Sequence, residues 1–449
     1  MFTHFKRMAW KASLSTTLIS LLVFTIALAA SGDLDAAFDG DGLVTTDFGV
    51  GVRSDVAYGI AIQANGKIVA AGSSFETSTS NYDFALARYN PNGSLDTTFS
   101  GDGKLITNFG SNDEAWDVAV QSDGKIIAAG RTCNSSGLAC NVALARYNTN
   151  GTLDTTFSGD GKQITDFDGG DNGSLGGLAI QSDGKIVLAG YVWNGMNNDF
   201  AVYRYNTNGT LDSSLTGDGM LRFGFGLGRE DRATDLDIQR TDGKIVVAGY
   251  SSGGANGYDF AIARLNPGGG FDTTFSGDGR QITNFGGEDF AYGFAGQPDG
   301  KMVVIGQKIN FAYTMSTFAI ARYNPNGSLD DTFGQLLPTG KRNGKKVFSV
   351  VPGAWSYAYD AVVQPGGKIL VMGANEAGSG LFDFALVRLN PGGGFDTSFS
   401  GDGKVTIDFG NNEHGRALVR QPSGGKYLLA GFIDDGTLGS DFALARVLP

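Results

Sequence analysis

The sequence predicts an all-β fold, a seven-bladed β-propeller with four antiparallel strands in each blade. The chain repeats itself: an Asp after Leu or Phe recurs at intervals of 61, 58, 58, 60, 58 and 66 residues, at Asp35, Asp96, Asp154, Asp212, Asp272, Asp330 and Asp396. Each unit contains four short β-patterned runs, such as "AWDVAVQ", "KIIAAGR", "NVALARYN" and "KQITDF". The chain also has 70 glycines in 449 residues, which indicates many turns. Four strands in about 60 residues are typical of one propeller blade.

The four runs have distinct characters that predict their order from the propeller axis outward. "GIAIQ" and its copies are short and made of small apolar residues, which suits the crowded innermost strand, A. "KIVAAG" is apolar on both faces and fits strand B between neighbouring blades. "DFALARYN" then forms strand C, and the more polar "KLITNF" forms the outer strand D. The Asn-Gly and Asp-Gly pairs between A and B accept the backbone of tight hairpin turns.

The ring is expected to close through its two ends. A D-type run at residues 43–48 has no earlier strand of its own blade, and a C-type run at residues 441–447 has no D strand after it. We therefore expect the N-terminal strand to join the C-terminal blade. The blades are expected at about 56–109, 115–167, 175–224, 233–285, 291–350, 358–409 and 415–447, the last completed by the closing strand 43–48.

A buried charge supports the same closure. Every C strand carries an Arg on the face of its Phe and Leu residues, and the recurring Asp follows shortly after it. An unpaired buried charge costs about 3–5 kcal/mol, so this Asp is the expected partner of the Arg. Arg446 has no Asp after it, and Asp35 is the one that could fill the role.

Residues 1–29 have the features of a signal peptide, and residues 30–449 are expected to form a single propeller. Lys6, Arg7 and Lys11 precede an apolar run that ends in small residues. The alternative is an uncleaved anchor, although the run is short for a bilayer-spanning helix. No membrane span is expected after the signal is removed. We expect a secreted, periplasmic or cell-surface protein.

The two cysteines lie seven positions apart in "RTCNSSGLAC". In an exported protein this spacing favours a disulfide between Cys133 and Cys140 that closes a short loop. Free thiols and a metal site are the alternatives, although two ligands are too few for structural zinc.

The connections between strands fall into two groups, which emerge on opposite faces of a propeller. The A–B and C–D connections are nearly constant, as in "QSDGK" and "NPNGSLDTTFSGDG". The B–C and D–A connections vary, as in "SFETSTSNY" and "GSNDEAW". Repeated loops maintain the architecture while varied loops can carry recognition, so a ligand site is expected on the varied face.

Candidate ligand-binding residues on the varied face are acidic or aromatic. The acidic residues form a group expected at the mouth of the channel, either as a hydrated rim or as a site for Ca²⁺ or a basic partner: Asp113, Glu114, Asp171, Glu230, Asp231, Glu288, Asp289 and Glu413. The aromatic candidates could stack on sugars or pack their own loops: Trp193, Phe311, Tyr313 and Trp355. His414 is the one histidine left after removal of the signal, and is expected to be a surface residue rather than a catalytic one.

The repeated "SGDG" is expected to be a turn. An EF-hand loop would need several more oxygen ligands and a closing Glu, which these copies lack. No cofactor is therefore predicted, with Ca²⁺ at the acidic group as the alternative. Removal of the signal takes away three basic and no acidic residues, so the net charge changes from −12 to −15. This charge argues against a nucleic-acid partner.

The stretch "DFALARYNPNGSLDTTFSGDGK", followed by "QSDGKIIAAG", resembles the delta-60 repeat family of exported bacterial proteins. The resemblance covers about residues 32–449 and implies a β-propeller of unknown function. It implies no catalytic motif, so no functional residue carries over.

Repeats, an export signal and the lack of a recognisable catalytic set favour a non-catalytic binding or adhesion scaffold. It would be a monomer that presents the varied loops to a protein or glycan. A carboxylate-based or metal-dependent propeller hydrolase is one alternative, and would need two carboxylates converging across the channel. A structural envelope protein is the other.

Overall fold

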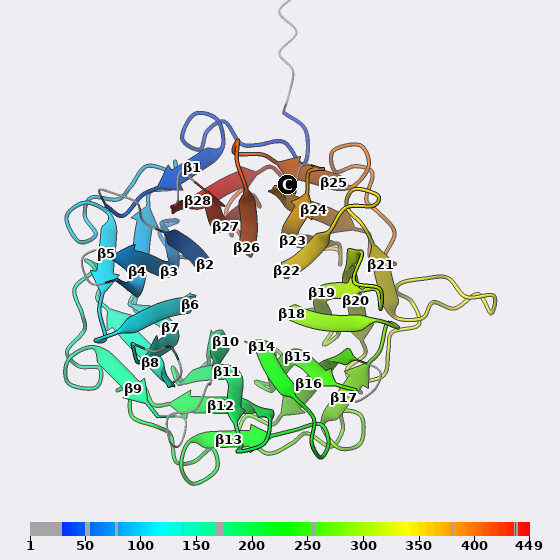
Figure 1. The fold of residues 1–449 in the computed structure, drawn as a ribbon, viewed down its shortest axis with the longest axis horizontal. Helices are drawn as coiled ribbons and strands as arrows, with labels where there is room; N and C mark the ends of the chain where they lie inside the picture. The colour runs from blue at the N-terminus through cyan, green and yellow to red at the C-terminus, as the bar shows by residue number, and fades with distance from the viewer. Residues whose placement is uncertain are drawn as a thin grey trace, which may run out of the picture.

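The computed structural model describes residues 29–49, 54–76, 80–135, 137, 139–166, 174–253, 257–378, 380–434, 436 and 439–449. Within these ranges, 28 strands form seven four-stranded antiparallel sheets. The sheets stand radially around a central axis (Figure 1). The predicted seven-bladed propeller is therefore confirmed. The described residues include no helix with the length and apolar character needed to cross a membrane.

Six blades are each built from four consecutive strands, with the first strand at the axis (Figure 1). The first three are β2 (Asp55–Ile62), β3 (Ile68–Glu76), β4 (Asn81–Tyr89) and β5 (Lys104–Thr107); β6 (Asn112–Val120), β7 (Ile126–Cys133), β8 (Cys140–Tyr147) and β9 (Lys162–Thr165); and β10 (Ser174–Ile180), β11 (Ile186–Trp193), β12 (Asn198–Tyr205) and β13 (Met220–Phe223). The next three are β14 (Asp231–Ile238), β15 (Ile245–Ser252), β16 (Tyr258–Leu265) and β17 (Arg280–Thr283); β18 (Glu288–Gly296), β19 (Met302–Ile309), β20 (Ser316–Tyr323) and β21 (Lys345–Phe348); and β22 (Ser356–Val363), β23 (Ile369–Glu376), β24 (Phe382–Leu389) and β25 (Lys404–Ile407).

The seventh blade joins the two ends of the chain. It contains β26 (Glu413–Arg420), β27 (Tyr427–Asp434) and β28 (Ser440–Val447), with β1 (Leu43–Thr46) as its outer strand. β1 pairs with β28 in antiparallel register, with Leu43 opposite Ala445. The predicted ring closure is confirmed. The closing strand ends two residues earlier than expected because the Phe48 N–H donates to Asp55 Oδ2 at 2.8 Å and turns the chain toward β2.

Each inner strand contains a β-bulge that requires glycine in the strand beside it. In β2 the register shifts between Ala57 and Gly59, so Tyr58 is an extra residue without a partner in β3. A Cβ on Gly72 of β3 would lie 1.8 Å from the carbonyl oxygen of Val56. The recurrent Gly at the end of "KIVAAG" therefore accommodates the bulge of the neighbouring strand.

The core lies between blades rather than within one layer. Residues of the second and third strands, such as Val69 of β3 and Phe84 of β4, are fully buried. They pack in one cluster with Val118 and Ile126 of the next blade. B strands are apolar on both faces because a neighbouring blade covers each face.

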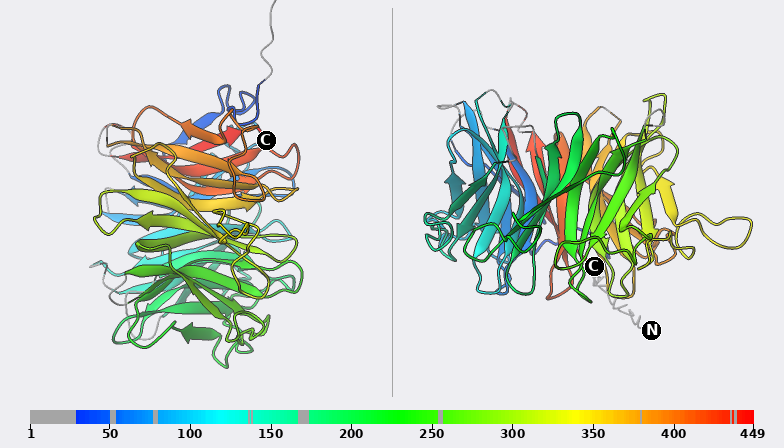
Figure 2. Two further views of the ribbon diagram at one scale, coloured as in Figure 1. Left: turned by 90° about the vertical axis from the view of Figure 1, so that its right-hand side faces the viewer. Right: turned by 90° about the horizontal axis from the view of Figure 1, so that it is seen from below.

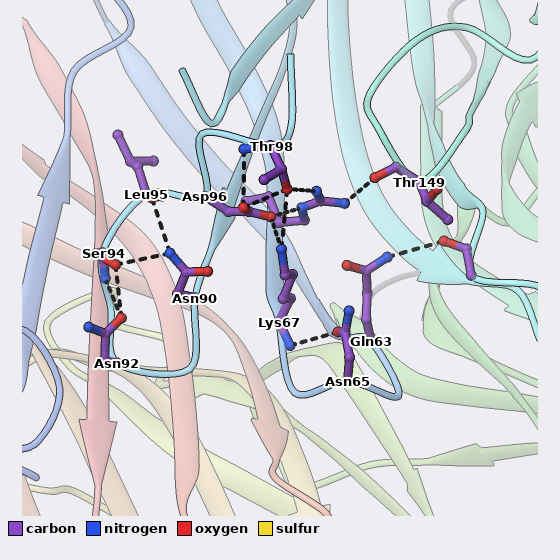
Figure 3. Close-up of polar contacts among 12 residues, drawn as sticks. Gln63, Asn65, Lys67, Asn90, Asn92, Ser94, Leu95, Asp96, Thr98 and Thr149 are labelled. Atoms are coloured by element: carbon purple, nitrogen blue, oxygen red, sulfur yellow. Dashed lines mark hydrogen bonds and ion pairs between the residues drawn. The ribbon is translucent and has the colours of Figure 1, made fainter. Parts of the chain in front are cut away.

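The recurring Asp is the centre of a charged cluster on the face that carries the A–B and C–D turns. In the first blade, Asp96 Oδ2 lies 2.6 Å from Arg88 Nε and 2.5 Å from Lys67 Nζ (Figure 3). Its Oδ1 accepts a hydrogen bond of 2.7 Å from the Thr98 hydroxyl. Burial alone would raise the pKa of Asp96, but the Lys67 and Thr98 hydrogen bonds and the charge of Arg88 lower it to about 2. The carboxylate is thus held in its charged form.

This cluster, here named the anchor cluster, occurs in all seven blades with an Arg Nε to Asp Oδ2 distance of 2.6 or 2.7 Å. In the seventh blade the partner of Arg446 is Asp35, at 2.6 Å. The anchor cluster also connects blades, since Arg88 donates to the carbonyl oxygen of Thr149 in the second blade; Figure 3 shows Thr149 beside Asp96 and Thr98 of the cluster. Arg446 likewise donates to Pro91 of the first blade, across the closure.

The two faces differ as the sequence predicts, and Figure 2 shows the connecting loops gathered on them. The C-terminus lies on the face of the anchor clusters. On the other face, Cys133 at the end of β7 and Cys140 at the start of β8 are opposite each other and form a disulfide. The predicted disulfide is confirmed. The "SGDG" Asp acts as a turn residue, as Asp102 Oδ1 accepts the Lys104 N–H at 2.9 Å.

Candidate ligand-binding site in the axial channel

A cavity of about 320 Å³ lies in the axial channel, lined by residues from all seven inner strands and by Tyr191 of β11. Most lining residues of the inner strands lie at or beside the bulges near the strand midpoints; Trp116 and Tyr292, for example, are each the fifth residue of a nine-residue strand. The cavity therefore lies around the middle of the channel. Its volume is at the lower end of the range for small-molecule sites.

The shape of the cavity follows from one strand position, the extra residue of each bulge. From the first blade to the seventh this position holds Tyr58, Trp116, Gly176, Thr234, Tyr292, Tyr359 and Arg416. Five neighbouring blades, from the fifth round to the second, thus carry large side chains at the axis. The third and fourth blades carry Gly and Thr, which leave the space that forms the cavity.

The large side chains make an aromatic wall. Tyr58 and Trp116 are stacked, with ring centroids 4.8 Å apart and an interplanar angle of 16°. Tyr292 and Tyr359 lie 5.4 Å apart. The Arg416 guanidinium sits over the Tyr359 ring at 4.3 Å, which is a favourable cation–π distance.

Two donor groups in this wall lack a hydrogen-bond partner among the residues that the structure describes. Trp116 Nε1 and Arg416 Nε are buried and have no hydrogen-bond partner within the described ranges. A buried donor without a partner costs about 1–3 kcal/mol, a cost that a bound ligand or water would remove. Both groups belong to residues that line the cavity.

Three carboxylates line the cavity next to the bulges: Asp117, Asp235 and Asp360. One oxygen of each carboxylate accepts a hydrogen bond from a backbone N–H of its own strand, and the other oxygen accepts one from a backbone N–H of the next blade. In Asp360 the two donors are Ala361 N–H at 2.6 Å and Leu418 N–H at 2.6 Å. Burial raises the pKa of Asp117 to about 6, and burial together with the Asp117 charge raises that of Asp360 to about 7. The pKa of Asp235 is raised well above its usual value by burial and by the charges of Asp360 and Asp117.

These aspartates alternate around the ring with glycines that make room for them. The same position holds Gly59, Gly177 and Gly293 in the first, third and fifth blades. A Cβ on Gly59 would lie 2.9 Å from the Cα of Asp117. The glycine thus permits the close approach of two inner strands. The Asp accepts a hydrogen bond from the inner strand of the following blade.

The predicted acidic rim is wrong in its location. Asp113, Asp231, Asp289 and Glu413 are fully buried residues at the starts of inner strands, where they face the outer strands of the preceding blade. Asp113 and Asp289, for example, accept the backbone N–H of Phe109 and Phe285 at 2.6 Å. The physical reason is that the D–A connection passes from the outer edge of one blade to the axis of the next, so its last residue is covered by both. Burial and the charge of Asp259 raise the pKa of Asp289 to about 7.

The three remaining described acidic candidates are engaged with neighbouring side chains. Glu114 forms a salt bridge with Arg131 at 2.7 Å. Glu230 forms one with Arg232 at 2.8 Å. Glu288 accepts the Tyr313 hydroxyl at 2.8 Å. Asp171 lies outside the described residues.

The predicted aromatic candidates lie around the cavity rather than in it. Trp193, at the end of β11, and Phe311 and Tyr313, on a B–C connection, are exposed, with exposed fractions of 37%, 63% and 59%. Trp355 precedes β22 and lies 6.3 Å from the ring of Tyr357. None of the four lines the axial cavity.

His414 is half-buried rather than a surface residue. Its ring lies between Phe382 at 4.9 Å and Phe432 at 5.1 Å. Burial and the charge of Arg416 lower its pKa to about 4, so the imidazole is neutral at neutral pH.

The residues that form the cavity wall were not identified from sequence. A column-by-column comparison of the seven inner strands would have found them, because the residue after the small Ala or Gly is large in five units: "AYG", "AWD", "AYG", "AYD" and "GRA". The unrecognised feature was the bulge, which turns this residue toward the axis.

Six segments of the chain match a family model described as a domain of unknown function (DUF5122) β-propeller: residues 63–99, 121–157, 181–215, 240–275, 297–333 and 364–399. These matches support a repeat β-propeller family. Each segment runs from the A–B turn through the marker Asp of the anchor cluster. Except for Tyr191, the cavity residues lie outside the matched segments.

Among solved structures, the polysaccharide lyase Uly1 is similar with 12% identity and a TM-score of 0.51, over 89% of this chain and 91% of that one. An α-L-arabinanase of Penicillium chrysogenum complexed with arabinobiose has 9% identity and a TM-score of 0.46, over 93% and 97%. A protein of unknown function from Dyadobacter fermentans has 10% identity and a TM-score of 0.44, over 91% and 99%. The likeness to Uly1 shows the shared fold. No curated protein matches the chain.

Proposed function

We propose that this repeat β-propeller is an exported, non-catalytic binding protein of the delta-60 type that holds a small glycan in its axial cavity. The observation that carries the proposal is the aromatic wall of the cavity, with the stacked Tyr58 and Trp116 and the Arg416 guanidinium above Tyr359. Aromatic faces bind the apolar faces of sugar rings, and the unpartnered Trp116 and Arg416 donors suit sugar oxygens.

A small ligand fits this site better than a protein surface does. The cavity has a volume of about 320 Å³ and is enclosed by the seven inner strands. The varied loops around its mouth, such as the one that carries the exposed Tyr313, would then contact further units of a longer chain.

Binding without catalysis agrees with the hydrogen bonds that occupy the carboxylate oxygens in the cavity. A glycoside hydrolase needs one carboxyl group free to donate a proton and a second free to attack or to activate water. Both oxygens of Asp360 accept backbone N–H groups, and so do both oxygens of Asp235. These groups hold neighbouring blades together, which favours a scaffold over the alternative of a carboxylate-based hydrolase.

The test is a binding screen of the full chain against neutral and uronic-acid oligosaccharides, followed by titration of any that bind. Trp116→Ala is expected to weaken binding at least tenfold, because it removes half of the stacked pair. Trp193→Ala is the matched control, since this Trp is exposed outside the cavity, and should leave binding within about twofold.

Binding that survives Trp116→Ala but is lost in Trp193→Ala would place the ligand on the loops and overturn the proposal. The absence of any binding across the screen would do the same. Release of reducing sugar from a bound oligosaccharide would favour the hydrolase instead.

A further inference from the structure

A cluster of carboxylates lies between the sixth and seventh blades, separate from the axial cavity. It contains Asp383, the second residue of β24; Asp408, which follows β25; and Glu413, the first residue of β26. One oxygen from each of the three lies within 4.8 Å of the other two. Sequence reasoning included Glu413 but neither aspartate.

Glu413 is aimed into this cluster and is incompletely satisfied. Its side chain is fully buried. Oε1 accepts the Asn411 N–H at 2.6 Å, whereas the buried Oε2 has no hydrogen-bond partner among the residues that the structure describes. A buried carboxylate oxygen without a donor is costly.

The surroundings add negative charge rather than compensating it. An oxygen of Asp383 and one of Asp408 lie within 4.8 Å of a Glu413 oxygen, so three acidic groups share one small space. Two occupants would relieve this repulsion: a proton held between Glu413 and Asp383, or a cation bound by all three carboxylates.

We propose that this inter-blade cluster binds Ca²⁺. Three carboxylates offer hard oxygen ligands, and Ca²⁺ accepts six to eight such oxygens in flexible geometry, with water completing the shell. Mg²⁺ demands a near-ideal octahedron and loses its waters reluctantly, which suits a partly buried cluster less well. Asp408 is exposed while Glu413 is buried, so an ion can enter from solvent and reach the buried oxygen.

The same three strand positions recur between other blades, which supports a built site rather than a chance grouping. Between the seventh and first blades they hold Asp441, Asp47 and Asp55, whose oxygens also lie within 4.8 Å of one another. The first and second blades have Asp83, Asn108 and Asp113, and the fourth and fifth have Asp259, Asn284 and Asp289. The fifth and sixth have Thr317, Ser349 and Ser356, without a carboxylate.

The position of the ion would make it a link between blades. Asp383 and Asp408 belong to the sixth blade and Glu413 to the seventh. A ligand that binds the folded state and not the unfolded chain raises the free energy of unfolding by mass action. Ca²⁺ is therefore expected to stabilise the propeller without occupying the axial cavity.

The experiment is calcium titration calorimetry on the full chain after removal of metal with EDTA, with the melting temperature measured in parallel. Glu413→Gln removes the charge of the buried ligand, and Asp408→Asn removes that of an exposed one without disturbing the core. The control is Asp278→Asn, an exposed carboxylate in a turn, paired with Arg280 at 3.2 Å.

We expect wild type and Asp278→Asn to bind the same number of Ca²⁺ ions and to melt at higher temperature with Ca²⁺. Glu413→Gln and Asp408→Asn should each bind one ion fewer. The proposal is overturned if wild type gives no binding heat, which would indicate the shared proton. It is equally overturned if a folded Asp408→Asn protein binds as many ions as wild type.

Discussion

Asp35→Ala tests the closure of the ring at its most sensitive contact. Asp35 Oδ2 accepts from Arg446 Nε and from Lys426 Nζ, both at 2.6 Å. Asp35 and Arg446 are 7% and 5% exposed. Removal of one partner of a buried ion pair costs about 3–5 kcal/mol, because the other charge is left uncompensated. The half-exposed Lys426 adds less than about 1 kcal/mol. We expect the free energy of unfolding to fall by about 3–5 kcal/mol.

Asp96→Ala is the matched control, because Asp96 makes the same contacts with Arg88 and Lys67. The two variants differ in chain distance: Asp96 is 8 residues from its Arg, whereas Asp35 is 411 residues from Arg446. Denaturant unfolding should therefore show similar losses for both. Hydrogen exchange should separate them, since only Asp35→Ala frees β1 from β28.

Two results would refute this reasoning. A loss below about 1 kcal/mol in both variants would mean that the buried Arg residues find other partners, so the anchor cluster contributes little. Faster exchange in β1 and β28 for Asp96→Ala as well as Asp35→Ala would mean that ring closure does not depend on the local contact.

Three further outcomes are expected. Replacing Cys133 and Cys140 with Ser should lower the free energy of unfolding by about 2–3 kcal/mol on the chain-entropy account, checked by denaturant unfolding; equal midpoints for oxidised and reduced wild type would contradict it. Gly130→Ala should cost more than about 3 kcal/mol, because its Cβ would lie 1.8 Å from a carbonyl oxygen, whereas Gly101→Ala, with open space and a φ of +94°, should cost about 1–2 kcal/mol. The pKa of Asp96 is lowered to about 2, so its stabilisation is fully present above about pH 4 and lost as the pH falls toward 2; unfolding measured across this range should show a smaller loss in Asp96→Ala than in wild type.

The fold could be predicted because each unit repeats the same local chemistry. Strand periodicity, turn residues and the spacing of the recurring Asp all indicated one blade, and the incomplete first and last units indicated the closure. The end of β1 could not be predicted, because Phe48 leaves the ladder through a bond to Asp55 in the first blade. That contact depends on how two blades meet.

The axial cavity was not predicted from the sequence. The varied face was expected to carry the ligand, whereas the cavity is lined by residues near the middle of the inner strands. Its wall was missed because simple alternation along a strand does not show which residue faces the axis when a bulge inserts Tyr58 between paired residues. The burial of Asp289 was missed because a loop position in sequence does not show that two blades cover it.

The alternation of Asp and Gly around the channel has a consequence for symmetry. Asp117 bonds the third blade, Asp235 the fifth and Asp360 the seventh, so each carboxylate joins an even blade to the odd blade after it. An alternation that repeats every two blades cannot be continuous around a ring of seven. It breaks at the seventh blade, where Ala417 occupies the position of the Asp or Gly. The ring therefore consists of three linked blade pairs and one single blade, the first, and the pattern breaks between that blade and the seventh, in which β1 and β28 meet. Adding or removing a whole pair would leave the carboxylate links of the other pairs unchanged, whereas adding or removing one blade would change the alternation of Asp and Gly at this break.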